Sequence, residues 1–382
     1  MHHKHSLLTV IAAMIIVAAM MVSCHSEPEL KSRRTVLVYM IATNSLGTGG
    51  FNADDIEEML QAARNGGLNG GRLLVYHTSY TQSPTLYEIK AESTGKAVLT
   101  KLKGYSQDVP SVAAERMAEV IADTKSIAPA DDYGLVMWSH GSGWLQDGME
   151  GLPSIRSFGQ DINKTMNVTT LAEVLGNDSF SFIYFDCCYM GAVEVAYELR
   201  HAARYIVSSP SELPTPGMDY SVNVPCFFAR TPDLAKAAWN TYDFYNRQSN
   251  ASMRTCTISV VDTRYMDDLA DACREIMVKS TWPAVPDYNV QKYMSGTCYH
   301  YDLRDYMQSI CTDDRALAAF DKALADAIVF EAATERLWDR IEIKKHCGLS
   351  AYMIRTQSNL TAKNYNTLSW YADVVSHMVE KQ

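Results

Sequence analysis

Two short segments of the sequence combine an apolar run with side chains that can take part in covalent chemistry. The first, residues 134–144, contains His140, and the second, residues 181–190, contains Asp186 followed by two cysteines. Each segment predicts a buried strand that ends in a turn. Because parallel α/β sheets keep their chemistry at the carboxyl ends of the strands, we expect these side chains at one edge of a sheet.

A thiol, an imidazole and backbone amides are the parts that a cysteine nucleophile needs to attack a carbonyl. Side chains alternate along a strand, so Asp186 and Cys188 should point to one side and Cys187 to the other. This alternation favours Cys188 over Cys187 as the nucleophile, with His140 handling protons. The N–H groups near Gly141 and at Cys188 could hold the oxyanion, since glycine lets the backbone approach a substrate closely.

The two segments resemble motifs of the clostripain-like cysteine peptidases, a family with a caspase-like fold. The matching runs are Trp-Ser-His-Gly-Ser-Gly-Trp at 138–144 and Phe-Asp-Cys-Cys-Tyr-Met-Gly-Ala-Val-Glu-Val-Ala-Tyr-Glu-Leu at 185–199. Further similarity lies at 36–42, 301–305 and 348–352. The two catalytic motifs are specific because they occur together, in this order, each after a predicted strand.

The resemblance implies a catalytic dyad of His140 and Cys188, with Asp186 as the acid in a pocket that accepts Arg or Lys before the cleaved bond. It thus implies a cysteine endopeptidase that acts on proteins or peptides with basic residues. Two alternatives stay open. Asp186 could instead orient His140 as the third member of a triad, with specificity set elsewhere. The chain could also be a catalytically silent, envelope-binding lipoprotein that keeps the fold.

A polar loop at 145–168 has no firm periodicity and is longer than most connections in a compact domain. It carries Arg156 and Lys164, which match the basic specificity that the resemblance implies. We hypothesise that a zymogen cuts itself here, with Arg156-Ser157 preferred and Lys164-Thr165 second. The alternative is a surface loop with incidental basic residues.

The Pro-rich loop at 209–220 should leave the same sheet edge and form a wall of the pocket. Glu212 or Asp219 could add a second carboxylate to the specificity pocket, although a loop acid is more often simply solvated. In the first helix of the chain, Asp54 and Asp55 are expected to be first-turn acids without a catalytic role.

The composition predicts a globular protein with a large core. The 382 residues are 47% hydrophobic and 20% charged, which is enough for one large domain or two. The formal net charge of −10 argues against a general nucleic-acid binder and suits a protein that meets basic substrates.

The N-terminus predicts export. A 16-residue, mostly apolar run at 7–22 is shorter than a membrane span of about 20 residues and suits the core of a signal peptide. The run ends in Met21-Val22-Ser23-Cys24, which looks like a lipobox, so Cys24 would be lipidated and become the first mature residue. Residues 25–34 would then tether the protein to the bacterial envelope. Plain secretion or an uncleaved anchor are the alternatives.

The nine cysteines do not suggest a disulfide framework. Setting aside Cys24 and Cys188 leaves seven cysteines, which is an odd number, and a chain of this length does not need disulfides to be stable. We expect mainly buried thiols at Cys226, Cys256, Cys273, Cys298, Cys311 and Cys347. No cysteine spacing suits zinc and no carboxylate cluster has calcium-ligand spacing, so no metal or cofactor is expected from the residues, and the resemblance leaves a calcium requirement open.

The element pattern predicts an α/β fold. A caspase-like domain at 35–280 should hold a mostly parallel central sheet flanked by helices, and a smaller, mainly helical domain should follow at 281–382. The boundary is placed at the Trp282-Pro283-Ala284-Val285-Pro286 break. Helices are expected at 191–203 and 316–329. His77, His300 and His346 are expected to be structural.

Overall fold

The structure is a computed structural model that describes residues 32–145, 157–280, 289–296, 299–353 and 365–379. These described residues, from Ser32 onward, form one compact unit. The predicted signal segment with Cys24, and the loop residue Arg156, lie outside them. Within the described part of the chain, every helix is too short or too polar to cross a bilayer.

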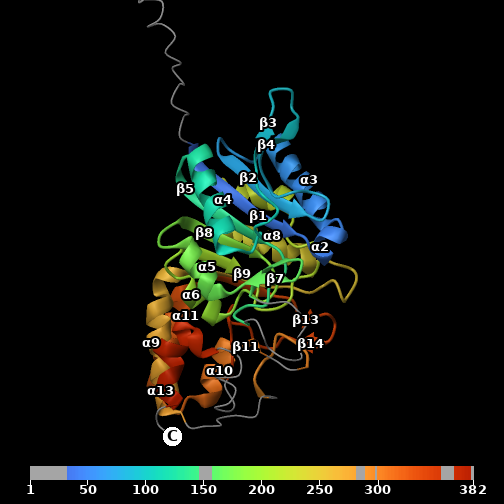
Figure 1. Cartoon of the computed structure of the whole chain (residues 1–382). Helices are drawn as coiled ribbons and strands as arrows, with labels where there is room; N and C mark the ends of the chain where they lie inside the picture. Colours follow the sequence, from blue (N-terminus) through green and yellow to red (C-terminus); the bar gives the residue numbers. More distant parts are fainter. Residues whose placement is uncertain (1–31, 146–156, 281–288, 297–298, 354–364, 380–382) are drawn as a thin grey trace, which may run out of the picture. The chain divides into compact units, whose positions relative to one another are not determined.

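A nine-stranded sheet organises the chain, in the order β12-β10-β9-β8-β5-β1-β2-β3-β4. The five central strands, from β9 to β2, pair in parallel, and antiparallel strands extend both margins. Figure 1 shows β3 and β4 at one of these margins. The strands are β1 (Ser32–Ala42), β2 (Arg72–Ser79), β3 (Thr85–Ala91), β4 (Ala97–Gly104), β5 (Ala130–Trp138), β8 (Phe180–Asp186), β9 (Ala203–Ser208), β10 (Thr257–Asp262) and β12 (Ile328–Ala333).

Helices cover both faces of the sheet, and this explains why the central strands are apolar at almost every position. Along β1, Leu37 and Tyr39 belong to one buried cluster, whereas Val38 and Met40 belong to the other. Two clusters on opposite faces are what a period of two produces when both faces are covered. The first cluster packs under α4 (Ala114–Ile127), α5 (Val168–Leu175), α6 (Val193–Glu198), α9 (Met266–Lys279), α10 (Leu303–Ile310) and α11 (Asp314–Ala327), and the second under α3 (Phe51–Arg64), α7 (Tyr220–Phe227) and α8 (Leu234–Asn246).

Short elements complete the described fold. They are α2 (Ser45–Thr48), the hairpin of β6 (Phe158–Asp161) and β7 (Lys164–Met166), the pair β11 (Tyr301–Asp302) and β15 (Ser350–Ala351), the hairpin of β13 (Arg336–Leu337) and β14 (Ile341–Glu342), a π-helix (Tyr371–Val375), α13 (Ser376–Val379), and 3-10 turns at Thr263–Tyr265 and Tyr365–Thr367.

Two expected helices are shorter in the structure. The helix expected at 191–203 is only α6, because the chain turns after Glu198 and enters β9 at Ala203. The helix expected at 316–329 ends at Ala327, and the next six residues form β12, which pairs with β10. Apolar residues continue across that junction, so helical and strand periodicity could not be separated there. The division of the chain near residue 281 stays a proposal.

The connection expected to be an irregular loop at 145–168 contains a hairpin instead. Strand β6 begins at Phe158, which also forms a bridge with Gly141, and the Gly159 N–H donates to the His140 carbonyl oxygen at 2.9 Å. The hairpin therefore holds the backbone at His140 and at the residue after it. A three- to four-residue strand is too short for alternation to reveal it in sequence.

Candidate active site

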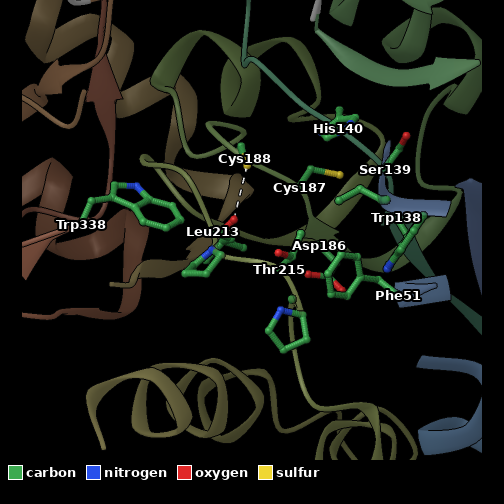
Figure 2. Close-up of a pocket in the computed structure, with 14 residues that line it drawn as sticks. Phe51, Trp138, Ser139, His140, Asp186, Cys187, Cys188, Leu213, Thr215 and Trp338 are labelled. Carbon is green, nitrogen blue, oxygen red and sulfur yellow. Dashed lines mark hydrogen bonds between the residues drawn. The ribbon is translucent and has the colours of Figure 1, made fainter. Parts of the chain in front are cut away.

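A cavity of about 190 Å³ opens where β5 and β8 end (Figure 2). The two strands pair in parallel with Trp138 opposite Asp186. Two residues beyond this pair, His140 and Cys188 both line the cavity. The remaining walls come from Leu46, Phe51, Ser139, Cys187, the segment from Leu213 to Gly217, and Trp338.

His140 lies at the rim of the cavity. Its Nε2 atom is 2.9 Å from the Ser45 hydroxyl of α2, which orients the ring. Partial burial lowers the pKa of His140 below its ordinary value, because loss of water disfavours the cation. The imidazole is therefore neutral at pH 7 and able to accept a proton.

Cys188 carries a protonated thiol. Its Sγ donates to the Leu213 carbonyl oxygen at 3.7 Å. Burial raises the pKa of Cys188 to about 12, and the nearby negative charges of Glu212 and Asp186 add to this effect. The thiol must turn away from Leu213 and lose its proton before it can attack a carbonyl.

Cys187 is held in the core. It is 3% exposed, and its Sγ donates to the Met137 carbonyl oxygen at 2.9 Å. Burial raises the pKa of Cys187 well above its ordinary value. The side chain belongs to the buried cluster on one face of the sheet, whereas Trp138, the register partner of Asp186, belongs to the other. The expected opposition of Asp186 and Cys187 is thus present.

Asp186 is a buried carboxylate at the floor of the cavity and is 7% exposed. It accepts hydrogen bonds from the Met218 N–H at 3.2 Å and the Tyr220 hydroxyl at 3.1 Å. Burial raises its pKa to about 7. Gly217 packs against it with a φ of +81°, and a Cβ there would lie 2.8 Å from an Asp186 oxygen, so this close approach requires glycine.

Asp55 is a second buried carboxylate, although its place in the first helix predicts only a first-turn acid without a catalytic role. It is 1% exposed and accepts a hydrogen bond of 2.5 Å from Trp138 Nε1. Burial, together with repulsion from Asp186, raises the pKa of Asp55 to about 9. One signal pointed to it: the buried face of α3, which includes Met59 and Ala62, is interrupted by an acid at this position.

Glu212 and Asp219 are the two loop acids considered for the specificity pocket, and neither of them lines the cavity. Asp219 caps α7, because its side chain accepts from the Ser221 N–H at 2.9 Å. Glu212 does not line the cavity, although its charge acts on Cys188. Glu58 of α3 acts on Asp186 electrostatically, because its negative charge raises the pKa of the Asp186 carboxyl. The loop itself forms the expected wall through residues 213–217.

Gly141 packs directly against the turn that carries Cys187 and Cys188. A Cβ at this position would lie 2.7 Å from the Cys188 carbonyl oxygen and 2.9 Å from the Cys187 Cβ. Only glycine therefore lets the histidine segment approach the cysteine segment this closely.

The remaining predicted residues lie away from the cavity. Lys164 is an exposed residue of β7. The three histidines expected to be structural are buried with hydrogen-bonded rings, namely His77 with Asn52, His300 with Ser350 and His346 with Tyr293. All seven described cysteines are free, and the described residues contain no group of three or more side chains suited to holding a metal ion.

Comparisons with known proteins give a consistent result. The sequence matches the model of the clostripain family over residues 38–381. An inactive zymogen C11 protease from Parabacteroides distasonis is 30% identical, with a TM-score of 0.80 over 90% of this chain and 99% of that chain. A secreted C11 cysteine protease from Bacteroides thetaiotaomicron, in complex with an irreversible peptide inhibitor, is 29% identical, with a TM-score of 0.79 over the same shares.

A clostripain from Bacteroides thetaiotaomicron in complex with the peptide inhibitor BTN-VLTK-AOMK is 27% identical, with a TM-score of 0.51 over 56% of this chain and 97% of that chain. A comparison with curated proteins gave no match. The structural matches confirm the predicted α/β, caspase-like fold.

The different surroundings of the two thiols predict their reactivity toward iodoacetamide. Cys188 should be alkylated well before Cys187, because Cys187 is buried and bonded to Met137. Only the thiolate reacts, and the pKa of Cys188 lies near 12, so the rate should rise about tenfold per pH unit between pH 7 and 9. Tandem mass spectrometry of the 185–199 region locates the label. The Cys187→Ala variant should be labelled like wild type, and equal labelling of both thiols would contradict the assignment.

Proposed function

Since the chain belongs to the clostripain family and is a cysteine peptidase, we propose that it cleaves proteins after Arg or Lys, with Cys188 as nucleophile and His140 as proton carrier. The observation that carries this proposal is the shared cavity: His140, Cys188 and the buried Asp186 line the same space. A thiol, a base and a buried carboxylate around one cavity are what cleavage after a cation needs.

The proposed reaction begins when the Cys188 thiol turns from Leu213 and passes its proton to the neutral His140. The sulfur attacks the carbonyl carbon of the peptide, and the oxyanion is held by N–H groups near Gly141 and at Cys188. The protonated imidazole then gives its proton to the leaving amine, which breaks the C–N bond. Water hydrolyses the resulting thioester and regenerates the thiol.

Asp186 supplies the proposed specificity by pairing with the cation of the substrate. Its two oxygens accept bonds from Met218 and Tyr220, not from His140, which favours the pocket role over the triad role. A guanidinium should bind better than an ammonium where both carboxylate arms are reached, because only the planar fork matches them. The relative that was solved with a VLTK-based inhibitor supports acceptance of lysine in this pocket.

Substitution of Asp186 by Asn tests the pocket role. Loss of the buried charge should lower kcat/KM for an Arg fluorogenic peptide about 100-fold while turnover of a citrulline analogue is retained. In wild type, Asp186 must be ionised to bind the cation and its pKa is about 7, so KM for the Arg peptide should fall as pH rises from 6 to about 8 and level off above.

The controls for this assay separate the alternatives. Cys188→Ala should abolish turnover, whereas Cys187→Ala should retain it. If Asp186→Asn lowers kcat for the Arg and citrulline peptides by the same factor and leaves the preference for Arg intact, Asp186 acts on His140 and the pocket role is wrong.

We further propose that the enzyme is made as a zymogen that cuts itself between residues 145 and 168. The relative described as an inactive zymogen supports this, as does the link between the β6–β7 hairpin and the His140 backbone. Arg156-Ser157 is the preferred bond and Lys164-Thr165 the second. Lys164 is exposed, but its place in β7 means that the hairpin must open before the strand can enter an active site.

Intact-mass analysis of the purified protein beside its Cys188→Ala variant tests self-cleavage. Wild type should give two fragments whose masses identify the bond, and the variant should stay whole. Arg156→Ala should move the cut to Lys164. A single uncut species in both proteins, or the same cut in both, would rule out self-cleavage.

Lipid anchoring at Cys24 is proposed from the lipobox-like run that precedes it. The secreted relative supports export, and the anchor would keep the enzyme on the bacterial envelope. Expression of the full chain followed by membrane fractionation should place wild type with the membranes and a Cys24→Ala variant mainly in the soluble or uncleaved precursor fraction. Equal release of both proteins from the membranes would exclude a lipid anchor at this residue.

A further inference from the structure

Trp338 has a backbone conformation that its side chain does not favour. Trp338 and Asp339 form the tip of the β13–β14 hairpin with φ angles of +52° and +55°, and the Arg340 N–H closes the turn on the Leu337 carbonyl oxygen at 2.9 Å. Turns with two left-handed residues favour Asn, Asp and Gly, whereas a bulky residue at such a position is an outlier. Asp339 suits the turn, and Trp338 does not.

Hydrogen bonds from the hairpin backbone hold Trp338 in this conformation. The Trp338 N–H donates to the hydroxyl of Thr255, which is fully buried, at 2.7 Å. The adjoining strand is tied by Thr334, whose N–H donates to the Cys256 carbonyl oxygen at 2.9 Å. The backbone of the hairpin tip is therefore attached to the segment that leads into β10, and this fixes the point from which the indole extends.

Core packing does not account for the strained tryptophan. Among the described residues, Trp338 belongs to neither buried cluster and is not one of the side chains packed against them. Its side chain is half-buried. The indole instead lines the cavity that also contains Cys188 and Leu213. In Figure 2, Trp338 lies on one side of Cys188 and Leu213, and Phe51 and Trp138 lie on the other.

We propose that Trp338 forms an apolar subsite for the substrate side chain next to the residue whose bond is cut. This rests on the proposed function, in which the cation enters beside Asp186 while its carbonyl meets Cys188. The neighbouring side chain then reaches the opposite end of the cavity, where the indole offers a broad apolar face. Trp338 is in this view a specificity-determining residue, and the preferred substrate carries a large apolar side chain beside Arg or Lys.

Strain of this kind persists where function requires it, because a residue better suited to the turn would relieve it. Asparagine at position 338 should therefore fold at least as well as tryptophan while losing the subsite. A residue kept for structure would show the reverse, with lower stability on substitution. The change in stability on substitution therefore has opposite signs for a functional and for a structural tryptophan, so measuring it separates the two roles.

The test is cleavage-site profiling of wild type, Trp338→Asn, Trp338→Phe and the control Asp339→Asn with a peptide library varied on both sides of the cut. Asp339 shares the turn and the positive φ, but it is exposed and does not line this cavity. Trp338→Asn should raise KM for peptides with Leu or Phe beside the cut residue about tenfold, with kcat unchanged and Gly-flanked peptides little affected. Trp338→Phe should keep most of the preference, and Asp339→Asn all of it.

Melting temperatures complete the test. Trp338→Asn should melt at or above the wild-type temperature. An unchanged ratio of Leu- to Gly-flanked cleavage in Trp338→Asn, or an equal loss on both together with a lower melting temperature, would overturn the proposal. The library contains every residue before the cut, so a failure of Arg or Lys specificity is seen separately and does not hide the flanking preference.

Discussion

The parallel pairing of β5 with β8 is the constraint on which the site depends. Because Trp138 and Asp186 are partners in register, His140 and Cys188 leave the sheet at the same rim, each two residues further along its strand. A slip of one residue would turn Asp186 to the opposite face. The close approach of the two turns is possible only because Gly141 has no side chain to meet the Cys188 carbonyl.

Burial away from water is the main electrostatic influence on the groups around the cavity. Burial raises the pKa of Cys188, Asp186 and Asp55 and lowers the pKa of His140, so it shifts each of these groups toward its neutral form. A bound cation acts in the opposite direction on the carboxyl groups, since an opposite charge nearby favours ionisation. In the proposed enzyme, charge therefore develops in the pocket when the substrate arrives.

The C-terminal part of the chain packs against the helix that follows the Cys187-Cys188 turn. Glu194 of α6 is fully buried and accepts from the Tyr352 N–H at 2.8 Å and the Tyr365 hydroxyl at 2.9 Å. Burial raises the pKa of Glu194 to about 7. Strand β12 joins the central sheet, and Trp338 reaches the cavity from the same part of the chain. Residues far beyond the two catalytic motifs therefore contribute to the pocket and support the turn that carries Cys188.

Local sequence was sufficient for the two strands that lead to His140 and Cys188, for the α/β class and for the wall at 213–217. These features depend on apolar runs, alternation and turn residues, which are properties of neighbouring positions. Asp55 and Trp338 were not predicted as parts of the site, because a helix acid and a hairpin tip reveal nothing of their partners until the chain is folded. Only the tertiary structure decided that Asp55 would be buried under Trp138, that β12 would extend the sheet and that Trp338 would face Cys188, since each depends on contacts between segments that are distant in sequence.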